Sequence, residues 1–305
     1  MSHQNVLWIG FAAVMAVMFV LDLGIFNRKS HEIRFREALA WTIAWVSLAL
    51  IFNIVIYKTM GQTKALEFFT GYIIEESLSV DNLFVFIMIF SYFRVSKTFQ
   101  PKILKWGIIG ALVLRAVFIF TGIELIERFH WMIYLFGGLL IVTGIKMGFH
   151  NEEEIHPERN ILVRLVKKFY PVGHNTKDGR FFVVENGRRA ITPLFLALIV
   201  VESSDVIFAV DSIPAIFAVT RDPFIVYTSN VFAIMGLRSL YYLLAGVMEM
   251  FVYLKIGVSF ILTYVGVKML LVDVYHIPIF FSLGVILGVL AISIITSVTI
   301  GRRRK

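Results

Sequence analysis

The chain has 305 residues, of which 58% are hydrophobic and 16% are charged, and its formal net charge is +8. Several apolar runs exceed the roughly 18 residues that a helix needs to cross a bilayer, which excludes a soluble domain and predicts a polytopic membrane protein. The basic residues lie mostly between the apolar runs, where membrane orientation accounts for them, so no nucleic-acid partner is implied. Because the chain has no cysteine, it forms no disulfide, thiolate metal site or cysteine nucleophile.

Hydropathy predicts an all-α fold, a single transmembrane domain with about nine membrane-spanning helices. In chain order these cover residues 6–26, 39–57, 67–93, 103–123, 129–149, 191–219, 224–247, 251–273 and 277–300. The first run has no basic start and no small-residue cleavage site, so we expect a retained helix and not a signal peptide. Most Lys and Arg residues lie on one side of this arrangement, which predicts an outside N-terminus and a cytoplasmic C-terminus.

The longest connection, residues 150–190, is predicted to be a basic cytoplasmic loop. Within it, residues 161–169 place apolar and basic side chains at helical spacing. This pattern favours a short amphipathic helix on the inner membrane surface, with a solvated connector as the alternative. Further along, Asn186 and Gly187 stand between apolar and basic flanks, which is typical of a tight hairpin turn.

Two acidic clusters lie inside very hydrophobic stretches of the chain. The first contains Glu75, Glu76 and Asp81, and the second contains Glu202, Asp205 and Asp211. Carboxylates at membrane depth are costly and usually mark function, so these residues are the first candidates for a site. The clusters also resemble each other, since the spacing from Glu75 to VDNL at 80–83 matches the spacing from Asp205 to VDSI at 210–213.

The similarity extends beyond the acids and predicts an internal repeat. Leu-Arg at 114–115 matches Leu-Arg at 237–238, and GIKM at 144–147 matches GVKM at 266–269. Residues 67–149 therefore form a first repeat of three spans, and residues 191–273 form a second. Because three is an odd number, the second copy must enter the membrane from the opposite side, and inverted repeats of this kind hold a transport site near the midplane.

Helix geometry restricts how the acids can meet. Six residues of helix turn through about 240°, so Glu75 and Asp81 cannot face one point on a regular helix, and the same holds for Asp205 and Asp211. One possibility is that the helices break, which Pro214 favours in the second copy. The other is that the carboxylates form successive cation-binding positions along a path, which we call stations. Arg115 and Arg238 are expected to be counter-charges for one or two of the acids.

The donors near both motifs are oxygen atoms of carboxylate, amide and hydroxyl groups, because all seven histidines lie in tails, loops or span ends. Oxygen donors suit Mn²⁺, Mg²⁺ or Ca²⁺ better than Zn²⁺ or copper. The candidate metal ligands are Glu75, Asp81, Asn82, Glu202, Asp205, Asp211 and Ser212. Glu76 is the weakest of the acids because it has no counterpart in the second copy.

The chain resembles the TerC/Alx family over nearly its whole length. The resemblance rests on EESLSVDNL at 75–83, TPLFLAL at 192–198, ESSD at 202–205, DSIP at 211–214 and SNVFAIMGLR at 229–238. It implies a bacterial inner-membrane protein of the wider lysine-exporter-like superfamily, associated with Mn²⁺ export, manganese homeostasis, alkaline response and tellurite resistance. The family's acidic positions fall on Glu75, Asp81, Glu202, Asp205 and Asp211.

The resulting interpretation is a secondary transporter, not an enzyme, that moves Mn²⁺ out of the cytoplasm with no permanently bound cofactor. Asp81, Asp205 and Asp211 are expected to be Mn²⁺ ligands. Glu75 and Glu202 are expected to be ligands or to carry the protons that enter in exchange for Mn²⁺. No G-x-x-x-x-G-K-[ST] motif is present for ATP binding. The alternatives are export of another cation or a cationic amino acid, an intramembrane hydrolase built on paired aspartates, and a membrane scaffold linked to tellurite resistance.

Overall fold

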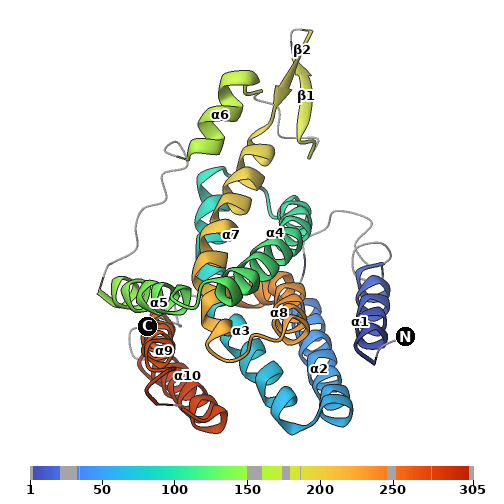
Figure 1. The fold of residues 1–305 in the computed structure, drawn as a ribbon. Coiled ribbons are helices and arrows are strands. Elements are labelled where there is room, and N and C mark those ends of the chain that lie inside the picture. The colour runs from blue at the N-terminus through green and yellow to red at the C-terminus, as the bar shows by residue number, and fades with distance from the viewer. Residues whose placement is uncertain are drawn as a thin grey trace.

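The computed structural model describes residues 3–20, 33, 35–149, 160–173, 179–185, 187–245, 252–275 and 277–301. In these ranges the chain forms ten α-helices and one two-stranded sheet (Figure 1). The elements are α1 (His3–Phe19), α2 (Phe35–Met60), α3 (Gln62–Tyr92), α4 (Gln100–Arg128), α5 (Met132–Phe149), α6 (Ile161–Phe169), β1 (Phe182–Glu185), β2 (Arg188–Ile191), α7 (Pro193–Phe217), α8 (Pro223–Leu244), α9 (Val252–Leu270) and α10 (Ile279–Gly301).

The predicted class, a helical polytopic membrane protein, is confirmed. Among the described residues, six helices are long and apolar enough to cross a membrane: α2, α4, α5, α7, α9 and α10. Helix α1 is shorter, and the predicted span ends at 21–26 and 246–247 lie outside the described residues. Helices α3 and α8 are long, but acids in α3 and an arginine in α8 lie among their apolar residues. The count of nine spans therefore stays a prediction.

Helix starts follow local capping rules. The side chain of Asp222 accepts hydrogen bonds from the backbone nitrogens of Phe224 (3.1 Å) and Ile225 (3.4 Å), and Pro223 occupies the first position of α8. Asn160 does the same for Leu162 and Val163 at the start of α6. Polar caps satisfy backbone donors that the first turn leaves open, and proline has no such donor there.

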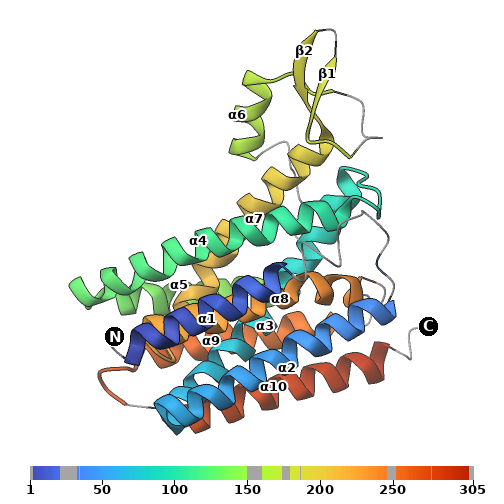
Figure 2. The same ribbon diagram turned by 90° about the vertical axis from the view of Figure 1, so that its right-hand side faces the viewer.

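The connection between α5 and α7 contains the two predicted features. Strands β1 and β2 pair antiparallel with Glu185 opposite Arg188, and Gly187 has a φ of 74°, the left-handed conformation that a tight turn requires. Asn186 lies outside the described residues. The predicted amphipathic helix is α6, which lies beside the hairpin and near the first turns of α7 (Figures 1 and 2). Its position on the membrane surface stays a prediction.

Helix α3 is central to the bundle. Its side chains enter three hydrophobic clusters, through Ile74 with α5 and α9, through Phe68 with α1 and α2, and through Phe86 with α4 and α7. In Figure 1, α1 and α2 lie on one side of α3, and α5, α9 and α10 lie on the other. The acids of α3 therefore lie among other helices, with Glu75 buried and Glu76 and Asp81 half-buried.

Helices α5 and α9 run antiparallel and meet closely at glycines. The hydroxyl of Ser259 on α9 donates a hydrogen bond to the carbonyl oxygen of Gly144 on α5 (2.5 Å). Seven residues earlier on α5, Gly137 faces Gly266 of α9. The contact is reciprocal, because Gly144 faces Ser259 and Gly266 faces Gly137, residues at equivalent places in the two predicted repeats. Small residues let the two backbones approach.

Gly144→Val is expected to destabilise the protein by about 1–3 kcal/mol, the usual effect of overpacking a tight interface. A Cβ atom at this position would lie 2.8 Å from the Ser259 carbonyl oxygen and 2.9 Å from the Thr263 backbone nitrogen. Gly138→Val is the matched control, since a Cβ there meets nothing within 4 Å. Thermal unfolding in detergent measures both, and equal melting temperatures would contradict the packing of α5 on α9.

Candidate intramembrane site

Helices α3 and α7 cross antiparallel and place the two acidic motifs against each other. At one end, Thr220 just beyond α7 donates a hydrogen bond to Glu67 of α3 (2.6 Å), and one turn along α3 Gly71 contacts Ile216. A further turn along each helix brings Glu75 and Ser212 to the same interface, because side chains four residues apart share a helix face. The two predicted repeats therefore contact each other at their acidic motifs.

The helices do not break at the motifs. Helix α3 is continuous from residue 62 to 92 and α7 from 193 to 217, so the expected break at Pro214 is wrong. Pro214 lies three residues before the end of α7, where a missing hydrogen bond needs little rearrangement. Of the two arrangements that the sequence left open, separate stations fit the continuous helices.

The first station is built around Arg115 of α4. A guanidinium nitrogen of Arg115 lies 2.5 Å from Oε1 of Glu75 and donates a hydrogen bond to Oδ1 of Asn230 on α8 (2.5 Å). The Asn230 amide in turn donates to the Val226 carbonyl oxygen (3.0 Å). The side chains of Arg115 and Glu75 are 4% and 1% exposed, so this is a buried ion pair joining α3, α4 and α8. We call Glu75, Arg115 and Asn230 the Arg115 network.

Two acids of α7 lie beside the Arg115 network. Asp205 is buried, and its charge interacts with those of Arg115, Glu202 and Glu75. The carboxylate of Glu202 lies directly against Gly110 of α4, where any side chain would collide with it. Asp205 also lines a small cavity together with Arg238 of α8, with room for about one water molecule. Glu75 and Asp205, which occupy equivalent positions in the two predicted repeats, thus share one electrostatic environment.

The second station lies on the other face of the α3 and α7 pair. Thr143 of α5 donates a hydrogen bond to Oδ1 of Asp211 (3.0 Å), and the charges of Asp211 and Asp81 interact. The adjoining residues Asn82 and Ser212 are both buried. Asp81 and Asp211 also occupy equivalent positions in the two predicted repeats, so each station contains one acid from each predicted repeat at matching positions.

Three buried oxygen atoms near these stations have no hydrogen-bond partner among the described residues. They are Oε2 of Glu75, Oε2 of Glu76 and Oγ of Ser212. Buried polar atoms are almost always satisfied in folded proteins, so each exception calls for a water, a proton or an ion. Glu75 belongs to the first station and Ser212 adjoins Asp211 of the second, so each station contains one of these atoms.

The predicted metal ligands do not converge on one point. Among the described residues, no three Asp, Glu or His side chains lie close enough together to hold a metal ion. The six-residue spacing on continuous helices explains this, since it directs Glu75 and Asp205 toward α4 and Asp81 and Asp211 toward α5. The seven candidates are therefore divided between two stations.

Two neutral residues of the stations were not proposed from the sequence as site residues. Thr143 and Asn230 both interrupt apolar stretches, at LIVTGIK and VYTSNVFA. A polar side chain inside a span is the signal that could have identified them, because such side chains usually bond across helices. Arg115 was expected to be a counter-charge, and its pairing with Glu75 confirms that expectation.

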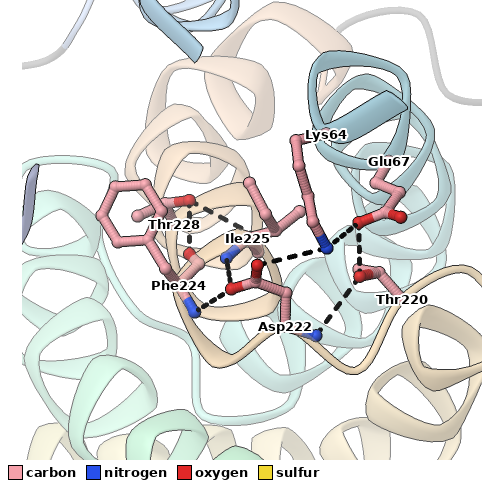
Figure 3. A network of polar contacts seen from close by, with 7 residues as sticks. All are labelled: Lys64, Glu67, Thr220, Asp222, Phe224, Ile225 and Thr228. Atoms are coloured by element: carbon pink, nitrogen blue, oxygen red, sulfur yellow. Dashed lines mark hydrogen bonds and ion pairs between the residues drawn. The ribbon is translucent and has the colours of Figure 1, made fainter. Parts of the chain in front are cut away.

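A separate polar network connects the start of α3 and the residues just after α7 to the start of α8 (Figure 3). The Lys64 ammonium lies 2.8 Å from a carboxylate oxygen of Glu67 and 3.2 Å from one of Asp222, and Thr220 bonds to Glu67. Lys64 and the two carboxylates are partly exposed beside an open hollow. This network fastens the helix ends and lies apart from the two stations.

Comparison with known proteins identifies the family. The family model described as integral membrane protein TerC family matches residues 60–305, which include both acidic motifs. The chain belongs to the TerC family. The TerC match also covers α4 and α8, which carry Arg115 and Asn230.

Full-length relatives of this TerC-family protein occur in several bacteria. A membrane protein of Myxococcus xanthus, STKORF319, is 52% identical over 95% of this chain and 91% of its own length. A candidate membrane-bound redox modulator named Alx, from Escherichia coli (strain K12), is 49% identical over 97% of this chain and 95% of its own length. A Rickettsia bellii membrane protein is 38% identical over 95% of this chain and 96% of its own length. No solved structure matches the chain.

Proposed function

We propose that this TerC-family protein is a secondary transporter that exports Mn²⁺ through the two carboxylate stations. One observation carries the proposal: six acids (Glu75, Glu76, Asp81, Glu202, Asp205 and Asp211) lie around the α3 and α7 crossing. Two arginines, Arg115 and Arg238, lie in the adjacent helices, whereas the lysines of α5 and α9 lie in the first or last turns of those helices. Glu75 and Asp205 are buried and the other four acids are half-buried. Because these six carboxylates outnumber the two arginines among the same helices, protons or metal cations are needed to balance them.

The inverted repeat is part of the proposal. It is supported by the pairing of equivalent acids, Glu75 with Asp205 and Asp81 with Asp211, and by the reciprocal glycine contacts of α5 and α9. It is further supported by equivalent helix neighbours, because α3 packs on α8 as α7 packs on α4. Inverted repeats allow one site to face each side of the membrane in turn.

The proposed topology has nine spans in the bacterial inner membrane, with the N-terminus outside and the C-terminus in the cytoplasm. The start of α1 and the end of α10 lie at opposite ends of the bundle, which fits an odd number of spans (Figure 2). The basic loop between α5 and α7 is then cytoplasmic, as the distribution of Lys and Arg favours.

Exchange for protons is the proposed energy source. Carboxyl groups that bind a divalent ion must release their protons, so the same acids can carry Mn²⁺ one way and H⁺ the other. Glu75, which pairs with Arg115, and Glu202, whose charge interacts with that of Asp205, are assigned the proton role. Asp211 accepts a hydrogen bond from Thr143, and Asn82 and Ser212 follow Asp81 and Asp211 in the sequence, so neutral oxygen donors are close to the second pair of acids. Oxygen donors of this kind suit Mn²⁺.

The alternative substrates fit the stations less well. A cationic amino acid would need a basic partner for its carboxylate. Arg115 already binds Glu75 and Asn230, and the cavity that Arg238 lines has room for only about one water molecule. The redox name of the Alx relatives cannot refer here to thiol chemistry within the chain, because the chain contains no cysteine. A scaffold would tolerate neutral replacements of the acids, and transport measurements on such variants separate it from a transporter.

Metal selectivity tests the proposed function. In proteoliposomes at matched free-ion concentrations, Mn²⁺ flux is expected to exceed Zn²⁺ flux by about tenfold or more, since Zn²⁺ prefers His and Cys ligands that the stations lack. Empty liposomes and liposomes with the Asp211→Asn variant are the controls. Equal Mn²⁺ and Zn²⁺ fluxes would overturn the oxygen-donor argument.

A further inference from the structure

Helix α6 carries an apolar face that the rest of the protein does not cover. Ile161, Leu162, Leu165 and Phe169 are 79%, 47%, 50% and 70% exposed. At 100° per residue these four side chains fall within an arc of about 100° on the helix. Four large apolar side chains on one face of a nine-residue helix form a contact surface, which we call the α6 apolar arc.

A second face of α6 fixes the helix to the protein. Val163 is 1% exposed and belongs to the cluster that contains Ile191 and Leu194, at the start of α7. Val166, about 60° from Val163 around the helix, packs against the same cluster. The orientation of the α6 apolar arc is therefore set by α7, the helix that carries Glu202, Asp205 and Asp211.

The third face of α6 is basic. Arg164, Lys167 and Lys168 lie on the side away from Val166, and Lys168 directly borders the α6 apolar arc at Ile161. A helix with an apolar arc next to a basic face is the usual form of a segment that lies in the membrane interface, with apolar side chains among acyl chains and basic ones among headgroups.

We propose that α6 docks onto the inner leaflet of the membrane and binds anionic phospholipid headgroups through Lys168 and Arg164. Two observations select the bilayer as the occupant. The charge of the basic face is complementary to an anionic leaflet, and α6 is held against α7, which is itself long and apolar enough to cross the membrane. The choice of the inner leaflet rests on the proposed topology, whereas membrane docking itself does not depend on the transported ion.

This docking gives α7 an attachment to the lipid at the end from which the acidic motif begins. Helix α6 contacts the first turns of α7, and Glu202 lies only two to three turns further along. Anionic lipid is therefore expected to stabilise this end of α7.

Because the chain has no native cysteine, single labelled positions test the proposal directly. Leu165→Cys is labelled with an environment-sensitive fluorophore and reconstituted in vesicles of phosphatidylethanolamine and phosphatidylglycerol. Lys167→Cys, on the opposite side of α6, is the matched control. The label at 165 is expected to emit at shorter wavelength and to be quenched several-fold more by lipids brominated in their acyl chains than the label at 167.

The charge requirement is tested by the Arg164→Gln/Lys168→Gln double variant. It is expected to reduce the acyl-chain quenching at position 165 by at least about twofold in the anionic vesicles. Phe169→Cys provides a second reporter on the α6 apolar arc if Leu165→Cys lowers the melting temperature. Equal quenching at 165 and 167, or protection of position 165 only after an acidic cytoplasmic protein is added, would overturn membrane docking.

Discussion

Arg115→Met is expected to lower the free energy of unfolding by about 3–5 kcal/mol, because it leaves the Glu75 carboxylate buried without its cation. The Glu75→Met/Arg115→Met double variant is expected to recover most of this loss, since apolar side chains of similar size can replace a buried ion pair with little loss of stability. Unfolding in detergent, followed by thermal or chemical denaturation, gives both values and the coupling energy between the two residues.

An exposed ion pair in the same helix is the control for Arg115→Met. Arg128 lies 2.6 Å from Glu124, but their side chains are 71% and 57% exposed. Exposed pairs contribute about 0–1 kcal/mol, so Arg128→Met should change stability little. If Arg115→Met were as stable as Arg128→Met, the Arg115 network would not be the buried pair described above.

Asp81→Asn and Asp211→Asn are each expected to reduce Mn²⁺ efflux by about 100-fold or more while the protein stays folded. Loss of a group that merely supports a metal ligand already costs about 10–100-fold in metal affinity or activity, and these acids are proposed to be ligands. Removing a buried charge also lowers the desolvation penalty, so the melting temperature should be unchanged or higher.

The double variant tests whether Asp81 and Asp211 act on one ion path or on two independent paths. If Asp81 and Asp211 act on the same ion, the Asp81→Asn/Asp211→Asn variant should be no less active than either single variant. Normal efflux in one single variant would remove that residue from the site. A large loss of stability in both would instead favour a structural role for the acids.

Patterns within single segments allowed much of the fold to be predicted. The apolar runs predicted the membrane helices, the spacing at 161–169 predicted α6, and the Asn186-Gly187 pair predicted the turn between β1 and β2. Each depends on the local sequence alone. Helix α3 shows where hydropathy alone fails to identify a membrane span. Its three central acids lower the mean hydropathy of the helix, although its polar side chains face other helices of the protein.

The division of the acids between two stations could be predicted only in part from the sequence. The 240° turn between Glu75 and Asp81 follows from the sequence, but which acid meets Arg115 depends on how α4 packs against α3 and α7. In the repeat, Glu75 and Asp205 are equivalent, so the sequence alone cannot assign the arginine to either. Whether Pro214 breaks α7 similarly depends on where the helix ends, which the sequence does not show.

Mn²⁺ flux in proteoliposomes with an imposed pH gradient shows whether this protein exchanges Mn²⁺ for protons. The protein is reconstituted, and Mn²⁺ movement and internal pH are recorded with and without the gradient, with Asp211→Asn as the inactive reference. If Mn²⁺ is exchanged for protons, an inward proton gradient is expected to accelerate Mn²⁺ exit, and Mn²⁺ exit is expected to acidify the vesicle lumen. Mn²⁺ movement no faster than in Asp211→Asn vesicles under any gradient would contradict the proposed Mn²⁺ transport.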